Sequence, residues 1–384
     1  MRIGIEAQRL YRKKKHGMDI VALELIKSLQ AIDKINEYII FVRPDRDNKC
    51  IPSAPNFKII ELRGCLFPFW EQIILPRAAE KERCDILQCT SNTGPIFCKI
   101  PIFTIIHDII YLESISLLKK RGTWYQKFGN MYRRIIVPII AKKSKRIITV
   151  SNFEKCVIDE YLNLGDNLVS IYNGIGDHFY KITDKQKLES AKEKYKLPDN
   201  FLFFIGNTDP KKNTPNVLKA FADYISRSQS KFKLVIVDFS ENKLIQLLNQ
   251  IGHPEILKYI STIGYVQNNE LPAIINQCKV FLYPSLRESF GIPIIEAMAC
   301  EVPVITSNTS SMPEIAGKAA VLVNPNYPTE ICDAIIQILD DETYRKQLIE
   351  LGLDQSKKFS RLAMAEKYLE LYKQVYNETK KISS

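Results

Sequence analysis

Two glutamates and the short stretch between them form the part of the sequence best suited to chemistry. Glu288 follows an apolar run, Val280–Tyr283, and Glu296 comes eight residues later. A helix must begin between them no later than Pro293, because proline is tolerated only in a first helical turn. The free backbone N–H groups of such a helix start attract anions, and carboxylates accept hydrogen bonds from hydroxyls. Two hydroxyl acceptors beside a phosphate cradle indicate a nucleotide-sugar site.

The same helix has a structural alternative. Residues 291–300 are apolar on nearly every face, so we expect this helix to be buried, and Glu296 is its one charge. A lone buried carboxylate is costly unless something pairs with it. Glu296 would then be a core glutamate that pairs with a neighbouring lysine or arginine.

A second set of candidate residues lies in the loop 206–213, which follows the apolar run 201–205 and precedes a helix. Lys211 and Lys212 stand next to each other in this loop. Two lysines at a strand-to-helix turn can neutralise a diphosphate without a metal ion. The alternative is an ordinary pair of surface lysines.

The first half of the chain offers one polar pair at the end of an apolar run. His107 and Asp108 follow the strand-like residues 102–106. Open α/β sheets bind ligands at the carboxyl ends of their strands, so this position favours a functional role. A lone histidine is otherwise most often structural.

Asp45 and Asp47 form a second pair that could hold a metal ion. They follow a strand-like run, but Pro44 and Asn48 flank them, and these residue types make an ordinary turn. No other site element lies nearby in the sequence. We therefore interpret the segment as a turn and expect no metal site.

The elements that position these residues repeat in a regular order. Apolar strand-like runs alternate with helical stretches in both halves, which predicts parallel, doubly wound α/β sheets. The expected strands are 2–6, 38–42, 58–62, 86–89, 102–106, 146–150 and 168–172, then 201–205, 233–237, 260–263, 280–283, 304–306 and 320–323.

The glutamate stretch also resembles a known family signature. Glu288-x7-Glu296, with Phe-Gly-Ile-Pro inside it and Ala-Met-Ala after it, resembles the motif of retaining glycosyltransferases of group 1, the glycogen-synthase-like enzymes. The loop 206–213 is similar to the family's Gly-x-x-x-Pro-Arg-Lys-Asn motif. Lys211 replaces the usual arginine there, and a lysine cannot chelate two phosphate oxygens as a guanidinium does. Ser289 and Glu301 stand where the family usually has glycine.

The resemblance implies a GT-B fold, in which two Rossmann-like domains carry parallel sheets that face a central cleft. It suggests that the last helix crosses back to the first domain. The expected parts are an acceptor-side domain at 1–176, a linker region at 177–199, a nucleotide-sugar domain at 200–355 and the returning helix at 356–384.

The implied reaction is transfer of a hexose from a nucleotide-diphosphate sugar to a hydroxyl of a glycan or lipid-linked acceptor, with retention, without metal or cofactor. A surface polysaccharide or lipopolysaccharide pathway is expected. The catalytic residues would be His107, Lys212 and Glu288. The expected donor contacts are Gly17, Asn207, Lys211, Lys212, Tyr265, Val266, Glu288, Ser289, Phe290, Gly291, Ile292 and Glu296, and the acceptor-side contacts are Met18, Asp19 and Asp108.

The charge of the chain is uneven. The formal net charge of +11 over 384 residues comes from residues 1–150, with 27 Lys and Arg against 14 Asp and Glu. Residues 115–146 combine basic and aromatic side chains, which suits an anionic membrane surface but also a solvated helix with a core stripe. The alternative to an enzyme is a basic scaffold that binds nucleic acid or anionic lipid; no nucleic-acid motif is recognised.

Composition bounds the location of the protein. A hydrophobic share of 46% and a charged share of 25% fit a soluble globular protein. No run reaches the roughly 20 apolar residues that a membrane span needs. The N-terminus enters a strand directly, so no secretory signal is expected. The nine scattered cysteines indicate reduced thiols. We expect a cytoplasmic protein, with peripheral attachment to the inner face of the membrane as a hypothesis.

Overall fold

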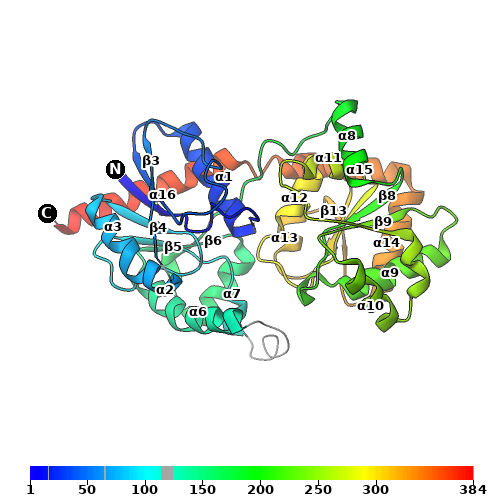
Figure 1. Cartoon of the computed structure of the whole chain (residues 1–384), viewed down its shortest axis with the longest axis horizontal. Coiled ribbons are helices and arrows are strands. Elements are labelled where there is room, and N and C mark those ends of the chain that lie inside the picture. The colour runs from blue at the N-terminus through cyan, green and yellow to red at the C-terminus, as the bar shows by residue number, and fades with distance from the viewer. Residues whose placement is uncertain (16, 65, 114–123, 384) are drawn as a thin grey trace. The chain divides into compact units, whose positions relative to one another are not determined.

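The chain forms two compact units. The computed structural model describes residues 1–15, 17–64, 66–113 and 124–383 (Figure 1). Unit 1 contains Met1–Gly174 together with Ser360–Ser384, and unit 2 contains Ile175–Phe359. Each unit has one sheet whose paired strands all run parallel. This is the doubly wound α/β architecture that the alternating runs predicted.

The sheet of unit 1 has seven strands in the order β3-β2-β1-β4-β5-β6-β7. They are β1 (Arg2–Glu6), β2 (Glu37–Val42), β3 (Phe57–Glu61), β4 (Ile86–Cys89), β5 (Ile102–Ile105), β6 (Arg146–Thr149) and β7 (Leu168–Ser170). Its helices are α1 (Gly17–Ile32), α2 (Phe67–Phe69), the π-helix η1 (Trp70–Ile74), α3 (Leu75–Lys81), α4 (Ile110–Glu113), α6 (Trp124–Lys143), α7 (Asn152–Leu162), the 3-10 helix η2 (Gly165–Asn167) and α16 (Arg361–Ser383).

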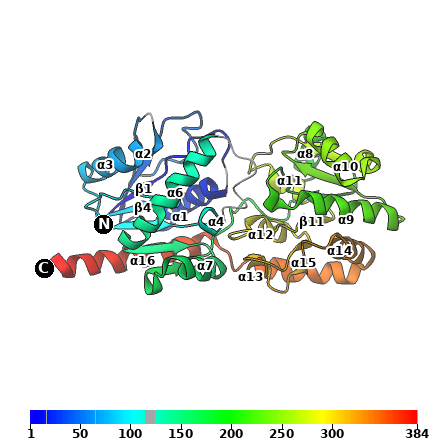
Figure 2. The same ribbon diagram turned by 90° about the horizontal axis from the view of Figure 1, so that it is seen from below.

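Alternation along the strands gives this sheet two buried faces. Tyr38 and Ile40 of β2 pack with α1 and α16, whereas Ile39 and Phe41 pack with Trp70 and the α3 side. Successive side chains of a strand point to opposite faces, so one strand serves both cores. Figure 2 shows α2 and α3 on one side of β1 and β4 and α16 on the other.

The return of the chain to unit 1 depends on a close backbone approach. Gly174 ends the first segment of the unit, and a Cβ atom there would lie 2.2 Å from the Arg361 Cα at the start of α16. Only glycine fits this position. Tyr368 and Tyr372 of α16 are buried, and the Tyr372 ring stands edge-on to Phe103 of β5 at 5.5 Å between centroids.

The sheet of unit 2 has six strands in the order β10-β9-β8-β11-β12-β13. They are β8 (Phe201–Phe204), β9 (Lys233–Val237), β10 (Ile260–Ile263), β11 (Val280–Tyr283), β12 (Val304–Ser307) and β13 (Ala320–Val323). Its helices are α8 (Lys185–Tyr195), α9 (Thr214–Arg227), α10 (Glu241–Ile251), α11 (Leu271–Ile275), α12 (Ile292–Ala299), α13 (Met312–Ala316), α14 (Pro328–Asp340) and α15 (Glu342–Ser356), with 3-10 helices η3 (Pro210–Lys212) and η4 (Pro254–Tyr259).

Residues 177–199 differ from a plain linker, because they belong to unit 2. Their helix, α8, buries Ala191 against Ala273 of α11 and Ile182. The expected returning helix starts at Arg361 rather than near 356, because residues 342–356 form the separate helix α15.

In the described part of the chain, no helix combines the length and hydropathy that a membrane crossing requires. The eight cysteines within this part are all free thiols.

Candidate functional site

The predicted glutamate stretch forms a loop and a buried helix in unit 2. β11 ends at Tyr283, and α12 begins at Ile292 with Pro293 in its first turn. Gly291 caps this helix with a φ of 98°, a left-handed conformation that glycine adopts without strain. Glu288 lies in the loop between them, and its residue exposure is only 8%.

Lys212 and Glu288 meet directly. The Lys212 Nζ atom lies 2.7 Å from Glu288 Oε1 and donates a second hydrogen bond, of 2.8 Å, to the Tyr283 hydroxyl. The side-chain exposures of Lys212 and Glu288 are 14% and 10%. Burial pushes the pKa of Glu288 upward, but the charges of Lys212 and Lys211 outweigh it, so this pKa lies below its ordinary value. Glu288 is therefore a carboxylate at neutral pH.

Glu296 lies near the same cluster. It is buried on α12, at 6% exposure. Burial raises the pKa of Tyr283 well above its ordinary value, and the charges of Glu288 and Glu296 add to this effect. Both glutamates thus lie around the Tyr283 hydroxyl. Sequence reasoning missed Tyr283 because it assigned the residue to an apolar strand; its position at the carboxyl end of β11 was the available signal.

A serine-rich loop holds this site loop in place. The Ser311 hydroxyl bonds the carbonyl oxygens of Glu288 (2.9 Å) and Phe290 (3.0 Å), and the Ser307 hydroxyl bonds the Ser285 carbonyl (2.6 Å). The Ser310 hydroxyl accepts the Glu288 N–H at 3.1 Å. The hydroxyls of this serine-rich loop therefore support the loop that carries Glu288.

The lysine loop lies against the same segment. The Leu286 N–H donates to the Lys211 carbonyl at 2.7 Å, and the Asn213 amide donates to the Pro284 carbonyl at 3.0 Å. No hydrogen bond or ion pair of the Lys211 ammonium is found among the described residues. Asn207 is exposed, and its side chain accepts the Asp209 N–H.

The remaining donor-side candidates of unit 2 lie at two places. Ser289 and Phe290 stand between Glu288 and the start of α12, where the Phe290 ring contacts Phe359 edge-on at 5.7 Å. Tyr265 and Val266 follow β10, which β9 separates from β8 in the sheet. Tyr265 is 37% exposed and Val266 is buried.

In unit 1, His107 is buried directly after β5. Its Nε2 atom lies 3.0 Å from the Thr90 carbonyl oxygen, and its backbone N–H donates to Asn92 Oδ1 at 2.7 Å. Because a carbonyl can only accept, Nε2 carries the proton and Nδ1 is left as an acceptor. Burial lowers the pKa of His107 below its ordinary value, so the ring is neutral at pH 7.

The other first-half candidates gather near this histidine. The charges of Asp108 and Asp19 both act on the pKa of His107, which they raise against the effect of burial. Asp19 is buried in the first turn of α1, where the helix dipole favours a negative charge. Gly17 begins α1, and Met18 follows it, half-buried.

Two further sequence features have clear structural positions. Asp47 pairs with Lys15, and Asp45 accepts the backbone N–H of Arg46, as expected for a turn. No group of three or more possible metal ligands occurs among the residues that the structure describes. Of the basic stretch 115–146, Lys119, Lys120 and Arg121 lie outside the described residues.

The exposed face of α6 is apolar. Phe128, Met131, Ile135 and Ile139 are 52%, 56%, 58% and 38% exposed, at spacings close to one helical turn. Phe97 is 82% exposed, and the Lys143 Nζ atom lies 5.1 Å from the centre of its ring.

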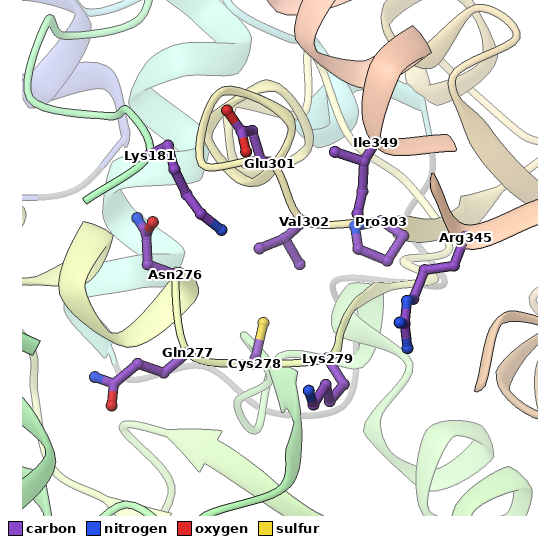
Figure 3. A pocket seen from close by; sticks show the side chains of 10 residues that line it. All are labelled: Lys181, Asn276, Gln277, Cys278, Lys279, Glu301, Val302, Pro303, Arg345 and Ile349. Carbon is purple, nitrogen blue, oxygen red and sulfur yellow. The ribbon is translucent and has the colours of Figure 1, made fainter. Parts of the chain in front are cut away.

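A hollow of about 200 Å³ lies elsewhere on unit 2, near the amino ends of β11 and β12 (Figure 3). Its lining includes Lys181, Cys278, Glu301 and Arg345. No predicted site residue lines it, because those residues stand at the carboxyl ends of the strands.

Two family models match the chain. Residues 185–354 match the model described as Glycosyl transferases group 1, and residues 16–178 match the one described as Glycosyltransferase Family 4. The first range lies within unit 2, and it includes the lysine loop and the glutamate stretch.

Curated relatives agree with these matches. The O-antigen chain mannosyltransferase B of Escherichia coli is 31% identical over 221 residues, which make up 56% of this chain and 57% of that protein. The serotype-specific mannosyltransferase WbdA of Escherichia coli is 27% identical over 260 residues, 67% of this chain but 31% of that protein. The chain therefore spans less than two thirds of either. A 41.2 kDa protein from the cps region of Klebsiella pneumoniae is 30% identical over 321 residues, 78% of this chain and 82% of that protein.

Solved structures with low sequence identity share the fold. Sucrose-phosphate synthase from Thermosynechococcus elongatus has a TM-score of 0.76 at 17% identity, covering 98% of this chain and 99% of that one. HepE from Anabaena, solved with UDP and glucose, has a TM-score of 0.72 at 16% identity, covering 97% and 99%. The fold is GT-B, with two Rossmann-like domains. With this fold and the family matches on both halves, the chain belongs to the group 1 glycosyltransferases.

Proposed function

We propose that the protein transfers a sugar from a nucleotide-diphosphate sugar to a hydroxyl of a glycan or lipid-linked acceptor, with retention at the anomeric carbon and without a metal ion. The observation that carries this proposal is the nearly buried Lys212–Glu288 pair beside the start of α12. Burying two charges is costly, and such a pair is retained where it serves a specific role.

Lys212 would stabilise the departing diphosphate. Its ammonium has three N–H donors, and two of them bond Tyr283 and Glu288. The third is available for a phosphate oxygen. Lys211 adds a second positive charge, and the N–H groups at the start of α12 add a positive dipole end. These charges supply what a metal ion would otherwise contribute.

The two glutamates would hold hydroxyl groups of the donor. Glu288 is ionised, and its second carboxylate oxygen can accept from a sugar hydroxyl while the first keeps Lys212. Glu296, one to two turns into α12, would accept from the ribose hydroxyls.

His107 would orient the transferred sugar. With Nε2–H bonded to the Thr90 carbonyl, its neutral ring offers Nδ1 as an acceptor for a sugar hydroxyl. No covalent nucleophile is assigned. We propose a same-face displacement, in which the leaving phosphate takes the proton of the acceptor hydroxyl.

Nucleotide binding tests the donor site. The melting temperature is measured with UDP, GDP, dTDP and ADP in the presence of EDTA. We expect the nucleotide with the correct base to raise it, because a ligand that binds only the native state stabilises that state. Lys212→Ala and Glu296→Gln should lose this shift, whereas Lys219→Ala, on the exposed side of α9, should keep it. A shift that requires magnesium would reject the metal-free mechanism.

The relatives support a proposal for the sugar and the pathway. Two of them are named mannosyltransferases, one of them for the O-antigen chain, and a third comes from a cps region. We therefore propose a hexose, with mannose first, and a role in surface polysaccharide or lipopolysaccharide synthesis. The anomeric configuration of the product, measured by NMR against that of the donor, tests retention; an inverted product would contradict it.

Attachment to a membrane is a separate part of the proposal. The exposed apolar residues of α6, with Lys142 and Lys143 at its end, suit the interface of an anionic bilayer. Met131→Asp with Ile135→Asp should abolish flotation with anionic liposomes. The matched variant Ile245→Asp, on exposed α10 of unit 2, should float like the parent protein. Equal flotation of both variants would refute this surface.

The non-catalytic alternative has less support. A basic scaffold on the same fold would not need a nearly buried lysine beside a buried tyrosine and two buried glutamates at the carboxyl end of β11. If no nucleotide raised the melting temperature of the parent protein, that result would favour the non-catalytic alternative.

A further inference from the structure

Unit 1 contains an arginine whose buried nitrogen has no partner. Arg9 lies in the turn that follows β1, and its Nε atom is buried without a hydrogen-bond partner among the described residues. A buried N–H without an acceptor destabilises a fold, because its lost hydration is not replaced. An orphan donor of this kind needs an explanation, and a bound acceptor group would provide one.

A second guanidinium lies beside it. Arg133 of α6 has its Cζ atom 6.0 Å from the centre of the Tyr111 ring. Burial lowers the pKa of Arg133, and the charge of Arg9 lowers it further, so the two cations are neighbours. The Tyr111 hydroxyl is also buried, and it has no hydrogen-bond partner in the described part of the chain.

The nearby carboxyl groups do not neutralise the positive charges of both Arg9 and Arg133. Burial raises the pKa of Glu71 to about 7, so much of it is protonated near neutral pH. Asp108 faces Arg133 and His107, and Asp19 also faces His107. Two neighbouring guanidiniums therefore lie near His107 within unit 1. Beside them, the Arg9 Nε–H and the Tyr111 hydroxyl are buried without a partner among the described residues.

We propose that Arg9 and Arg133 form an oxyanion subsite in unit 1, next to His107, for a phosphate or carboxylate group of the acceptor. The planar fork of a guanidinium matches both groups, and the Tyr111 hydroxyl adds a further donor. That the bound molecule is the acceptor rests on the proposed function. The acceptor class is thus a sugar that carries an acidic group, or a phosphate-linked carrier.

Thermal shifts with inorganic phosphate, glucuronate and glucose, at constant ionic strength, test the subsite. We expect phosphate or glucuronate, but not glucose, to raise the melting temperature, and the stronger of the two identifies the source of the oxyanion. Arg9→Gln with Arg133→Gln should weaken this binding about 10- to 100-fold, the effect of losing charge-assisted hydrogen bonds. Arg77→Gln, an exposed arginine on α3, serves as the matched control.

Two further measurements separate the possible failures. Lys212→Ala should keep the phosphate shift and lose the nucleotide shift, and the double arginine variant should do the reverse. Without ligand, Arg9→Gln should not lower the melting temperature, since it removes an orphan donor and a repulsion; a purely structural Arg9 would lower it. In the Lys212→Ala background, which removes the proposed diphosphate site, a phosphate shift that survives Arg9→Gln with Arg133→Gln, or that glucose matches, would overturn the subsite whatever the nucleotide result.

Discussion

At the scale of single residues, Glu71 has the most informative chemistry outside the proposed donor site. It lies in the π-helix η1, and it accepts hydrogen bonds from Thr93, Tyr132 and Gln72. Burial nevertheless raises its pKa to about 7. Short π-helical segments often occur at functional sites, and this one lies on the Arg133 side of unit 1.

The raised pKa of Glu71 makes the stability of the protein depend on pH. Its pKa is about 7 in the folded state, against an ordinary value of 4.5, so the folded state binds the proton more tightly than the unfolded chain does. The resulting stability is present below pH 4.5 and is lost as pH rises to 7, by about 3 kcal/mol in total. Glu71→Gln should therefore gain stability relative to the parent protein at pH 8 but not at pH 4.5.

Urea unfolding at the two pH values measures this difference. Glu80→Gln, an exposed glutamate on α3, is the control and should show no pH-dependent gain. Equal differences between Glu71→Gln and the parent at both pH values would mean that folding does not raise the pKa of Glu71.

The sequence could indicate which polar residues stand at strand ends, but not which residues lie beside them in the folded protein. Lys212, Glu288 and His107 stand out in sequence because each follows an apolar run, where α/β sheets bind ligands. Arg9 has no such signal. Its neighbour Arg133 is more than 120 residues away, and only the packing of α6 brings the two together.

At the scale of elements, the backbone just after α12 is strained at Glu301, and a substitution there can relieve the strain. Glu301 follows Cys300 with a φ of 58°, a left-handed conformation in which non-glycine residues are strained. Ser289, the other departure from the family pattern, has no positive φ. The resemblance therefore pointed to two unusual positions, and only Glu301 has a backbone reason for glycine.

Glu301→Gly should stabilise the protein by about 1 kcal/mol, because relief of the left-handed strain exceeds the added chain entropy. Chemical denaturation gives the difference directly. Glu301→Ala keeps the strain and should show no gain. A loss of stability in the glycine variant would mean that the Glu301 side chain, which lines the hollow shown in Figure 3, stabilises the fold by more than the backbone strain costs.

The serine-rich loop should affect donor binding through the position of Glu288. Ser311→Ala removes the donor to the Glu288 and Phe290 carbonyls, inside a fully buried site, and should lower stability by about 1–3 kcal/mol. Nucleotide affinity should fall as well. Thr309→Ala removes a longer, exposed bond to Leu286 and should leave both quantities nearly unchanged. Titration calorimetry with the identified nucleotide measures the affinity; unchanged affinity in Ser311→Ala would show that the loop is not needed for the site.

Strand positions followed from the sequence, but strand ends and loop roles did not. The runs 2–6, 86–89, 233–237, 260–263, 280–283 and 320–323 match the observed strands, and other ends shift by one or two residues. The hydrophobic period fixes where a strand lies, whereas its end depends on the neighbouring strand's hydrogen bonds. The hydroxyl bonds of residues 307–311 depend on a packing that no local pattern encodes.

At the scale of the whole molecule, unit 2 is one continuous segment and unit 1 is not. The chain leaves unit 1 after Gly174 and returns at Ser360. The stretch 173–175, Asn-Gly-Ile, predicted a domain boundary near 176. Residues 177–199 were interpreted as a linker because they are polar and charged. Their packing on α11 uses only a few apolar side chains, such as Ile182 and Ala191.

A fragment of residues 175–359 should fold alone and bind nucleotide. It contains the complete six-stranded sheet, its helices and the Lys212–Glu288 pair. Cooperative thermal unfolding and the same nucleotide shift as the full chain are the expected results. The complementary fragment 1–174 should fail to unfold cooperatively, because it lacks α16. A fragment 175–359 without cooperative unfolding would show that unit 2 depends on unit 1 for its stability.

The late position of α16 in the chain also sets the order of events during synthesis. Domains tend to fold as they are made, at roughly 5–20 residues per second, so unit 2 alone takes roughly 10–40 s to emerge. Throughout that time the apolar face of β1, β2 and β5 that α16 covers stays open, although it was synthesised first. The first-made half of the protein is thus the last to be completed. A chain truncated just before residue 361 would therefore contain a complete unit 2 and a unit 1 with an exposed apolar face, which is a substrate for chaperones.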